Sequence, residues 1–438
     1  MNILFYVHGF RDRDFWPIAR SVVRAGHQIY YSIAHRTGLK SVVGADRVLN
    51  FDLVISSDKM TKMPDGVFVN RILVKRPPLF EIIFNDLVEI VTEYGDDDHS
   101  FSTLRQNKVT LGCLDRDLLE SATAVGVPSA VYLQYGVQPL AIADAGYFPR
   151  RRGRRIFGKI CPDDLAAPRV IDRALSRLAH TLLGYGHHRR TTDVVFLGEC
   201  SLGPDPVVLE YIGTHFLNGA TLTSLLATDA LIREELAASV AEPPIYESTA
   251  VLTALTRHLP PCREGHMGKI GFLLMKEHYE SQFRAARRLA YARHLSTALG
   301  NRFHLYGDHF IKHGLPARPS DHKSTEHKYL GSKIAIDFGS MTYGSSLDTR
   351  PTRIISCESL LLQLRRNDAG NVYGELADKM TYTSRDEMLA MVDSYLTSPA
   401  AAMSTVLEER ALSATSCGMD AIVGEFMATK PWNAPPSH

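Results

Sequence analysis

The chain has 438 residues, enough for two or three domains, and this length excludes a small scaffold held together by disulfides. Its 49 Lys and Arg residues nearly balance 48 Asp and Glu residues, so the net charge of +1 excludes a general attraction to polyanions. With 45% hydrophobic and 22% charged residues, the composition is that of a globular protein rather than a disordered or fibrous one.

The cysteines and the N-terminus bear on location. None of the 6 cysteines forms a C-x-x-C pair, which favours free thiols over a zinc site built on paired thiolates. The first residues lack the pattern of a secretory signal, and no stretch of about 18 apolar residues predicts a membrane-spanning helix. We therefore expect a cytoplasmic protein, with peripheral contact to the inner face of a membrane left open.

The first 188 residues alternate short apolar runs with segments of helical spacing, beginning with a helix expected at 15–24. The runs predicted as strands are residues 3–7, 28–32, 52–58, 109–113 and 127–134. Continuous apolar strands separated by helices are typical of a parallel sheet covered on both faces. We expect one doubly wound, Rossmann-like domain over residues 1–188, with 150–190 acting as a basic crossover and linker.

The strand pattern restarts at residues 193–198 and predicts a second α/β domain over 189–415. A helix-rich segment, 204–265, interrupts it. Beyond that we expect strands at 269–273, 302–307, 333–338 and 360–364, and helices at 281–299 and 384–396, the last capped by Thr383. A C-terminal helix and tail would occupy 416–438. Two such α/β domains facing a central cleft would hold ligands at the carboxyl ends of their strands.

Four motifs follow one another between residues 304 and 399. They are L-Y-G-D at 305–308, Y-L-G-S-K-I-A-I-D-F at 329–338, S-S-L-D-T-R-P-T-R-I-I-S-C-E-S at 345–359 and Y-T-S-R-D-E-M-L at 382–389. This succession resembles the C-terminal half of spore-maturation-protein-like bacterial glycosyltransferases, which are related to the large family 4 group. The resemblance implies the GT-B fold, with two Rossmann-like domains. It also implies a nucleotide-sugar donor on the C-terminal domain and an acceptor on the N-terminal one.

Arg350 takes the place of the arginine in the family motif, but Arg353 stands where the family has a glutamate expected to bind the donor ribose. A carboxylate accepts hydrogen bonds from a sugar diol, whereas an arginine cannot accept any. Either Glu358 supplies the carboxylate from a shifted position, or the donor is held differently, with Arg353 on a phosphate. A buried structural carboxylate is the competing interpretation of Glu358.

Polar loops follow Tyr306 and Phe338, where strands of the second domain are expected to end. We expect the donor to bind there, although turns or surface charges would also explain several of these residues. The donor-binding candidates are Tyr306, Gly307, Asp308, Tyr343, Asp348, Arg350 and Arg353, and Glu358 is a catalytic candidate.

In the N-terminal half, His8 and Gly9 follow the first predicted strand. A histidine titrates near neutral pH and could serve as a general base, although a lone histidine is also common in structural roles. Gln134, Tyr135 and Gly136 resemble the acceptor-side Q-H-G turn of several GT-B enzymes. We therefore take His8 as a catalytic candidate and the other four residues as acceptor-binding candidates.

The remaining charged clusters do not predict a metal or a cofactor. Asp96, Asp97, Asp98 and His99 are consecutive and are expected to form a solvated loop, so we predict no metal and no cofactor besides the nucleotide sugar. A second cluster could bind an anionic lipid, glycan or phosphorylated acceptor, or form a surface loop; without interleaved aromatics it does not favour nucleic acid. It comprises Arg150, Arg151, Arg152, Arg154 and Arg155.

We predict a metal-independent glycosyltransferase that moves a sugar from a nucleotide donor to a glycan or lipid-linked acceptor. An epimerase or hydrolase of sugar nucleotides with the same fold is one alternative. A non-catalytic nucleotide-sugar or glycan-binding protein is another, and it is made plausible by the missing motif glutamate. Modified DNA or protein is a less favoured acceptor.

Overall fold

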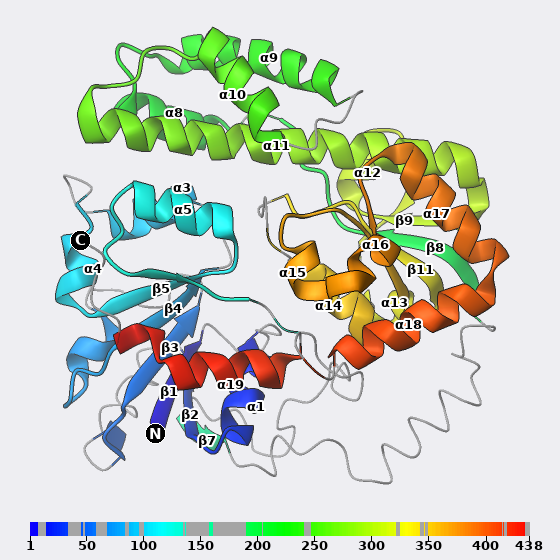
Figure 1. Cartoon of the computed structure of the whole chain (residues 1–438). Helices are drawn as coiled ribbons and strands as arrows, with labels where there is room; N and C mark the ends of the chain where they lie inside the picture. Colours follow the sequence, from blue (N-terminus) through cyan, green and yellow to red (C-terminus); the bar gives the residue numbers. More distant parts are fainter. Residues whose placement is uncertain are drawn as a thin grey trace. The chain divides into compact units, whose positions relative to one another are not determined.

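The computed structural model describes residues 1–7, 15–33, 45–46, 49–57, 68–83, 87–95, 100–134, 136, 157–160, 190–203, 205–240, 247–320, 325–341, 346, 349–413, 415 and 418–433. The chain divides into two compact units (Figure 1). The first comprises Met1–Ala179 and Ala411–His438, and the second comprises His180–Arg410. Each is an α/β unit built on a twisted, mainly parallel sheet, which is the Rossmann-like architecture expected from the sequence.

The first unit contains a seven-stranded sheet in the order β6-β5-β4-β3-β1-β2-β7. Among the described strands, all neighbours pair in parallel except β7, which is antiparallel to β2 at the edge. The strands are β1 Asn2–Val7, β2 Gln28–Ile33, β3 Leu53–Ser57, β4 Leu79–Ile83, β5 Val109–Cys113, β6 Ala130–Tyr132 and β7 Phe157–Ile160.

Two of these strands were not expected from the sequence. Strand β4 holds Glu81, a carboxylate that is fully buried and accepts a hydrogen bond from the Tyr94 hydroxyl. Strand β7 lies within the segment 150–190 that was interpreted as linker, so that interpretation is wrong for 157–160. Strand β7 pairs with β2, which is more than 120 residues earlier in the chain, and the local sequence gives no sign of this pairing.

The helices of the first unit include one from the far end of the chain. Asp420 of α19 accepts hydrogen bonds from Ser21 and Arg24 of α1, and Phe426 packs edge-on against Phe80 of β4 with ring centroids 4.7 Å apart. The C-terminal helix therefore completes this unit. The helices are α1 Phe15–Arg24, α3 Leu87–Tyr94, α4 Ser102–Gln106, α5 Arg116–Ala124 and α19 Met419–Thr429, with short 3₁₀ turns at Val69–Ile72 and Pro431–Asn433.

The second unit contains a six-stranded parallel sheet in the order β10-β9-β8-β11-β12-β13. The strands expected at 193–198, 302–307, 333–338 and 360–364 are all present, because continuous apolar runs of this length are typical of strands buried on both faces. The strands are β8 Thr192–Leu197, β9 Phe303–Tyr306, β10 Ala317–Arg318, β11 Ser332–Asp337, β12 Leu360–Leu364 and β13 Thr381–Tyr382.

Helices cover this sheet and interdigitate with it through an apolar core that includes Phe196, Leu295 and Leu362. Helix α17 begins after Ser384, whose hydroxyl accepts a hydrogen bond from the Glu387 amide, so the cap is Ser384 rather than the expected Thr383. The helices of this part are α12 Asp308–Lys312, α13 Thr325–Leu330, α14 Thr349–Ser356, α15 Ala369–Tyr373, α16 Ala377–Met380, α17 Arg385–Thr397 and α18 Pro399–Ser413, with 3₁₀ turns at Gly300–Arg302 and Gly374–Leu376.

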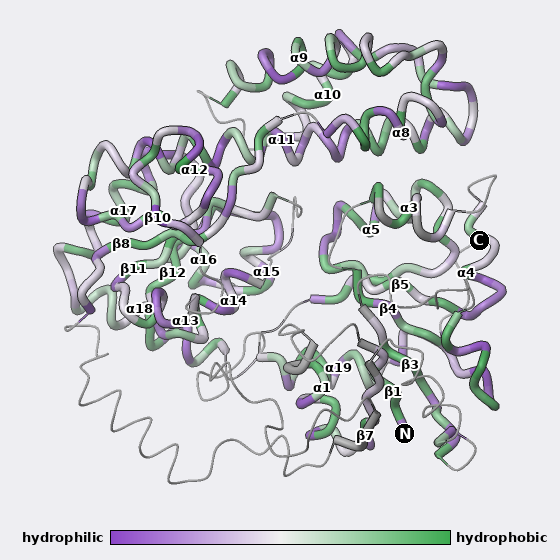
Figure 2. Tube along the Cα trace, turned by 180° about the vertical axis from the view of Figure 1, so that it is seen from behind, coloured by the Kyte–Doolittle hydropathy of each residue, from purple (hydrophilic) through white to green (hydrophobic). Residues whose placement is uncertain are grey.

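Between β8 and β9 lies the helical segment, made of α8 Pro206–Phe216, α9 Leu222–Ser239, α10 Glu247–His258 and the 35-residue α11 Gly265–Leu299. The strand expected at 269–273 is wrong, because these residues form the start of α11. Ile270 and Leu274 lie four positions apart on one buried helix face, and Gly271 lets the backbone approach Phe216. Hydrophilic and hydrophobic residues alternate along α11 (Figure 2). In the part of the chain that the structure describes, no helix combines the length and apolar character needed to cross a bilayer.

Candidate functional site

The carboxyl ends of β8, β9, β11 and β12 lie along one edge of the second sheet, where ligands of open parallel sheets ordinarily bind. The residues that follow these strands are Gly198, Gly307, Phe338 and Arg365. We call this the carboxyl edge. Its geometry depends on two loops and on a set of arginines supplied by α11, α14 and the segment after β12.

The backbone after β8 and the backbone after β9 lie against each other. The Gly198 amide donates to the Tyr306 carbonyl at 3.1 Å, and Gly307 has φ +151°. A Cβ on residue 307 would lie 2.0 Å from the Gly198 carbonyl oxygen. Both the backbone angle and the close approach therefore require glycine at this position.

The side chain of Glu199, which follows β8, lies at the first turn of α12. Its carboxylate accepts hydrogen bonds from the amides of Asp308 and His309 at 3.1 and 3.0 Å and lies 2.9 Å from His309 Nδ1. Partial burial raises the pKa of Glu199, but these hydrogen bonds outweigh it and hold the pKa below its usual value. Asp308 is a donor-binding candidate from the sequence, and its backbone amide thus donates to Glu199.

Tyr306 places an aromatic ring among cations. Lys328 Nζ lies 4.3 Å from the ring centroid, and Arg318 donates to the Tyr306 hydroxyl at 3.3 Å. The ring is partly exposed, beside Gly307. Two cations therefore flank this ring.

The second loop begins with Asp337 at the end of β11. The Asp337 carboxylate is nearly buried and accepts from Arg350 Nη1 at 2.6 Å and from the Gly339 amide at 3.2 Å. Arg350, in the first turn of α14, also lies against Phe196, with its guanidinium carbon 5.4 Å from the ring centroid. Its side chain retains 18% exposure, so Arg350 is oriented by a carboxylate and still reaches the surface.

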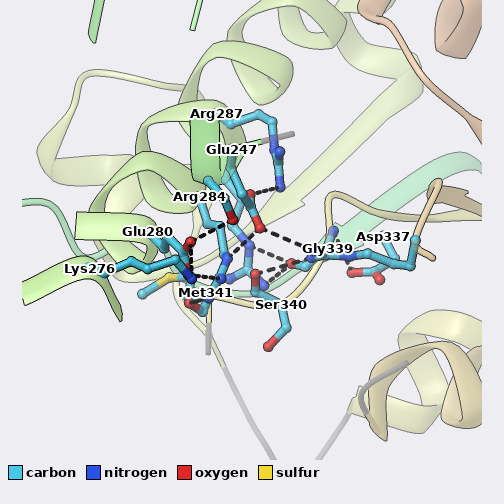
Figure 3. A network of polar contacts seen from close by, with 12 residues as sticks. Glu247, Lys276, Glu280, Arg284, Arg287, Asp337, Gly339, Ser340 and Met341 are labelled. Atoms are coloured by element: carbon cyan, nitrogen blue, oxygen red, sulfur yellow. Dashed lines mark hydrogen bonds and ion pairs between the residues drawn. The ribbon is translucent and has the colours of Figure 1, made fainter. Parts of the chain in front are cut away.

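After Phe338, the carbonyls of Gly339, Ser340 and Met341 all accept hydrogen bonds from arginines (Figure 3). Arg288 donates to the Gly339 carbonyl at 2.8 Å, Arg366 to the Ser340 carbonyl at 3.3 Å and Arg284 to the Met341 carbonyl at 3.0 Å. We call Gly339–Met341 the post-β11 segment. Because the arginines come from α11 and from the end of β12, this segment is held from two sides.

Glu247 joins these arginines from α10 (Figure 3). Its carboxylate lies 2.8 Å from Arg284, 2.9 Å from Arg287 and 3.7 Å from Arg366. Burial raises the pKa of Glu247, but the three guanidiniums outweigh burial and lower the pKa to about 2. Glu247 is therefore a carboxylate at any ordinary pH.

Among the described residues joined by these ion pairs and hydrogen bonds, cations outnumber carboxylates. The cations are Lys276, Arg284, Arg287, Arg288, Arg350 and Arg366, and the carboxylates are Glu247, Glu280 and Asp337. A positive excess in a largely buried environment attracts an anion more strongly than the same charges in water. The carboxyl edge is therefore suited to a phosphate or diphosphate group.

The structure separates Glu358 from Arg350. Glu358 follows α14 at the amino side of β12, with φ +55°, whereas Arg350 lies at the carboxyl edge. The Glu358 carbonyl accepts from Arg190 at 2.6 Å, and its carboxylate lies 3.3 Å from Arg410. Arg353 is one turn beyond Arg350 in α14 and half-buried. Thus Tyr306, Gly307, Asp308 and Arg350 are brought to one edge, and Glu358 is not.

Two candidates of the first unit are described. Gln134 follows β6 at one end of the sheet order, while β1, the strand before His8, lies four strands away, on the order of 19 Å at ordinary strand spacing. A Cβ on Gly136 would lie 2.5 Å from Met419 Cα, so this glycine allows α19 to pack closely. Outside the described residues lie His8, Gly9, Tyr135, Tyr343, Asp348, the cluster 96–99 and the arginines at 150–155.

Sequence reasoning missed Glu247, Arg284, Arg288 and Arg366. The only local signal is the pair Arg284 and Arg288, four residues apart in a helix and hence on one face. Nothing in that spacing says that the face is buried, since arginines are usually exposed. Over the described ranges, no group of three or more His, Cys, Asp or Glu residues could hold a metal ion.

No protein-family model matches the chain, and no curated protein matches it. Among solved structures, the chain is similar to the DNA-modifying β-glucosyltransferase of phage T4, studied with uridine diphosphoglucose: 8% identity, TM-score 0.47, 99% of this chain and 100% of that one. Sucrose-phosphate synthase of Thermosynechococcus elongatus is 10% identical with a TM-score of 0.43, over 98% of this chain and 98% of that one. Anabaena HepE in complex with UDP-glucose is 11% identical with a TM-score of 0.39, over 98% of this chain and 99% of that one. All three TM-scores lie below 0.5, and no conclusion about this chain rests on them.

Proposed function

We propose that the second unit binds a nucleotide sugar at its carboxyl edge and that the chain is a glycosyltransferase. The observation that carries this proposal is Arg350, held by Asp337 at 2.6 Å and backed by buried arginines at the edge where parallel sheets bind ligands. The motif resemblance over residues 304–399 supports the same activity. A guanidinium gives two parallel, charge-assisted hydrogen bonds to a phosphate, which suits a diphosphate.

The chemistry follows from the charge that develops. Transfer breaks the bond between the anomeric carbon and the phosphate oxygen, and the nucleoside diphosphate leaves with that electron pair. The acceptor hydroxyl forms the new bond to the anomeric carbon and gives its proton to a base, for which His8 is the candidate. Fixed positive groups beside the departing diphosphate lower the barrier most when they are already oriented, as Arg350 is by Asp337.

We further propose a glycan or lipid-linked acceptor, with no cofactor or metal besides the donor. The basic sequence at residues 150–155 would suit an anionic acceptor. DNA and protein enter the acceptor panel as less favoured substrates. Product analysis separates transfer from epimerisation or hydrolysis, since only transfer joins the sugar to the acceptor.

The position of Glu358 favours a second candidate, a nucleotide-sugar-binding protein without turnover. Glu358 does not lie at the carboxyl edge, and the Asp337 carboxylate there is already paired with Arg350. Glu358 therefore does not supply, at this edge, the carboxylate that the family glutamate would offer to a donor ribose. Donor binding without release of nucleoside diphosphate in the presence of any acceptor would favour this function over transfer.

The first test is a thermal-shift screen with sugars linked to UDP, GDP, dTDP, ADP and CMP. A ligand at about 100 times its dissociation constant adds about 2.7 kcal/mol to the free energy of unfolding, so a selective rise identifies the base. Calorimetry of that nucleotide with Arg350→Ala should show affinity weaker by about 1.5–3 kcal/mol, the usual range for charged hydrogen bonds.

The matched control is Arg302→Ala. Arg302 also pairs with an aspartate, Asp193 at 2.9 Å, but it precedes β9 at the opposite edge of the same sheet. Its loss should leave nucleotide affinity unchanged. Equal affinities for wild type and a folded Arg350→Ala variant would remove Arg350 from the site, and no shift with any nucleotide would contradict the proposed function.

A further inference from the structure

Helix α10 contributes a buried carboxylate to the network at the carboxyl edge. Glu247 is the first described residue of α10 and only 8% exposed, and its carboxylate contacts arginines from two other elements. These are Arg284 and Arg287 of α11, and Arg366 after β12. Among the described residues, Glu247 is the carboxylate that pairs with all three, so it is the common partner of this group.

Two of the same arginines also hold the post-β11 segment. Arg284 uses Nε for Glu247 and Nη1 for the Met341 carbonyl. Arg366 lies with Nη1 toward Glu247 and Nη2 toward the Ser340 carbonyl. Each guanidinium therefore lies between the carboxylate and a carbonyl of the loop. Arg284 makes two hydrogen bonds and Arg366 makes one ion pair and one hydrogen bond, and the planar fork of arginine fixes the relative direction of the two contacts.

The loop fits closely onto these arginines. Gly339 has φ +86°, and a Cβ there would lie 2.1 Å from Arg366 Nη2. The Asp337 side chain that orients Arg350 lies two residues earlier and also accepts from the Gly339 amide at 3.2 Å. A shift of the post-β11 segment would therefore move the groups that aim Arg350.

Burial makes the Glu247 charge important. Arg284, Arg287 and Arg366 are each at least nine-tenths buried, so their mutual repulsion is weakly screened by solvent. Removing the negative charge that faces all three arginines, while Glu280 remains beside Arg284, weakens the compensation of these buried cations, and they must separate or recruit water. Either response changes the direction of the bonds to the Ser340 and Met341 carbonyls.

We propose that Glu247 is a positioning residue, which sets the conformation of the post-β11 segment through Arg284 and Arg366 and thereby prepares the carboxyl edge for a diphosphate. This role rests on the proposed function, since it concerns the same edge. It also makes the helical segment part of the donor site's architecture, with α10 acting on the edge although Glu247 itself contacts no substrate.

The test compares Glu247→Gln with Asp229→Asn. Asp229 is a fully buried carboxylate of α9 that pairs with Arg233 at 2.7 Å; it belongs to the same helical segment but, among the described residues, does not contact the network directly. Both variants should lower the melting temperature. Hydrogen exchange of a peptide covering 338–341 should speed up at least tenfold only in Glu247→Gln, and calorimetry with inorganic pyrophosphate should show at least tenfold weaker binding only in that variant.

Where Glu247→Gln does not fold, Arg366→Lys replaces it, because a lysine lacks the planar fork that places separate nitrogens beside Glu247 and the Ser340 carbonyl. Native exchange at 338–341 and native pyrophosphate affinity in the folded variant would overturn the positioning role. Equal effects of Asp229→Asn would also overturn it, since they would mark a general loss of stability. If the wild type binds neither pyrophosphate nor any nucleotide, the proposed function fails, while the exchange rates still decide whether Glu247 positions the segment.

Discussion

Glu247 and Glu409 are both buried glutamates of the second unit, and their pKa values move in opposite directions. Three guanidiniums surround Glu247 and lower its pKa to about 2 despite burial. Glu409 is 1% exposed and accepts one hydrogen bond, from the Leu361 amide at 3.0 Å, so burial dominates and raises its pKa well above the usual value. The local number of cations decides which form of a buried carboxyl group is stable.

Glu409→Gln should stabilise the protein at neutral and higher pH. Above about pH 4.5 the unfolded chain releases the Glu409 proton while the folded chain retains it, so wild-type stability falls as pH rises toward the folded pKa. Glutamine keeps an acceptor for the Leu361 amide without this cost. The melting temperature of the variant should exceed that of the wild type by about 2–4 °C for each kcal/mol gained at pH 8, and the difference should vanish near pH 4.

The neighbouring residue supplies the control. Glu408 is exposed and pairs with Lys379, so Glu408→Gln should leave the melting temperature almost unchanged over the same pH range. A lower melting temperature for Glu409→Gln than for the wild type at pH 8 would show that the Glu409 side chain is charged and paired in the folded protein.

Glu247 predicts the reverse pH dependence. Its folded pKa of about 2 lies below the unfolded value, so its contribution to stability is fully present above about pH 4.5 and is lost as pH falls toward 2. The difference in melting temperature between wild type and Glu247→Gln should therefore be constant from pH 6 to 8 and shrink below pH 4.5. A difference that grew on acidification would contradict the ionised state of Glu247.

At the scale of elements, the turn from β9 to α12 depends on one glycine. Gly307→Ala should lower the free energy of unfolding by about 2–4 kcal/mol, because the positive φ and the 2.0 Å approach to the Gly198 carbonyl add together. Gly314→Ala is the matched control: φ is +74°, but a Cβ would meet nothing within 4 Å, and about 1 kcal/mol is expected.

Denaturant unfolding of the two variants measures both costs. Equal losses for Gly307→Ala and Gly314→Ala would mean that the backbone angle alone matters and that β8 and β9 can separate at this turn. A larger loss at 307 would establish the close approach of the two loops at the carboxyl edge.

The start of α11 shows how an apolar run can mislead. The sequence at 269–273 fits a short strand, but in the helix Ile270 and the following Leu274 share one buried face. Short apolar runs do not distinguish a strand from a buried helix, because periodicity needs several turns to appear. Only the packing of α11 against α8 and α10 selects the helix.

At the scale of the whole molecule, the end of the chain completes the first unit. Phe426 of α19 contacts Phe80 of β4, and Asp420 binds α1. The chain thus enters the second unit near residue 179 and leaves it near residue 410 to return to the first. Residues separated by several hundred positions form one core.

Phe426→Ala should destabilise the first unit by about 3–5 kcal/mol, the usual cost of removing a buried phenyl ring. Hydrogen exchange should speed up in β1, β4 and β5 and stay unchanged in β8, β11 and β12. Phe310→Ala, a fully buried ring beside Phe196, is the matched variant for the second unit and should give the opposite pattern. Faster exchange in both sheets with either variant would mean that the two units unfold as one cooperative body.

The sequence by itself determined the α/β class, the strands 3–7, 193–198, 333–338 and 360–364, and the grouping of Tyr306, Gly307 and Arg350. These follow from local physics, because a strand buried on both faces must be continuously apolar and loops after parallel strands meet at one edge. The carbohydrate-transfer hypothesis came from motif order and stays a proposal.

Only the tertiary structure decided the contacts of Glu247, Arg284, Arg288 and Arg366, the pairing of β7 and the placement of Glu358 away from the carboxyl edge. Charged residues carry no sequence signal for burial, since the cost of burying them is offset by partners far along the chain. Glu247 and Arg366 are 119 positions apart, and their contact exists only because α10 and the end of β12 fold onto the same loop.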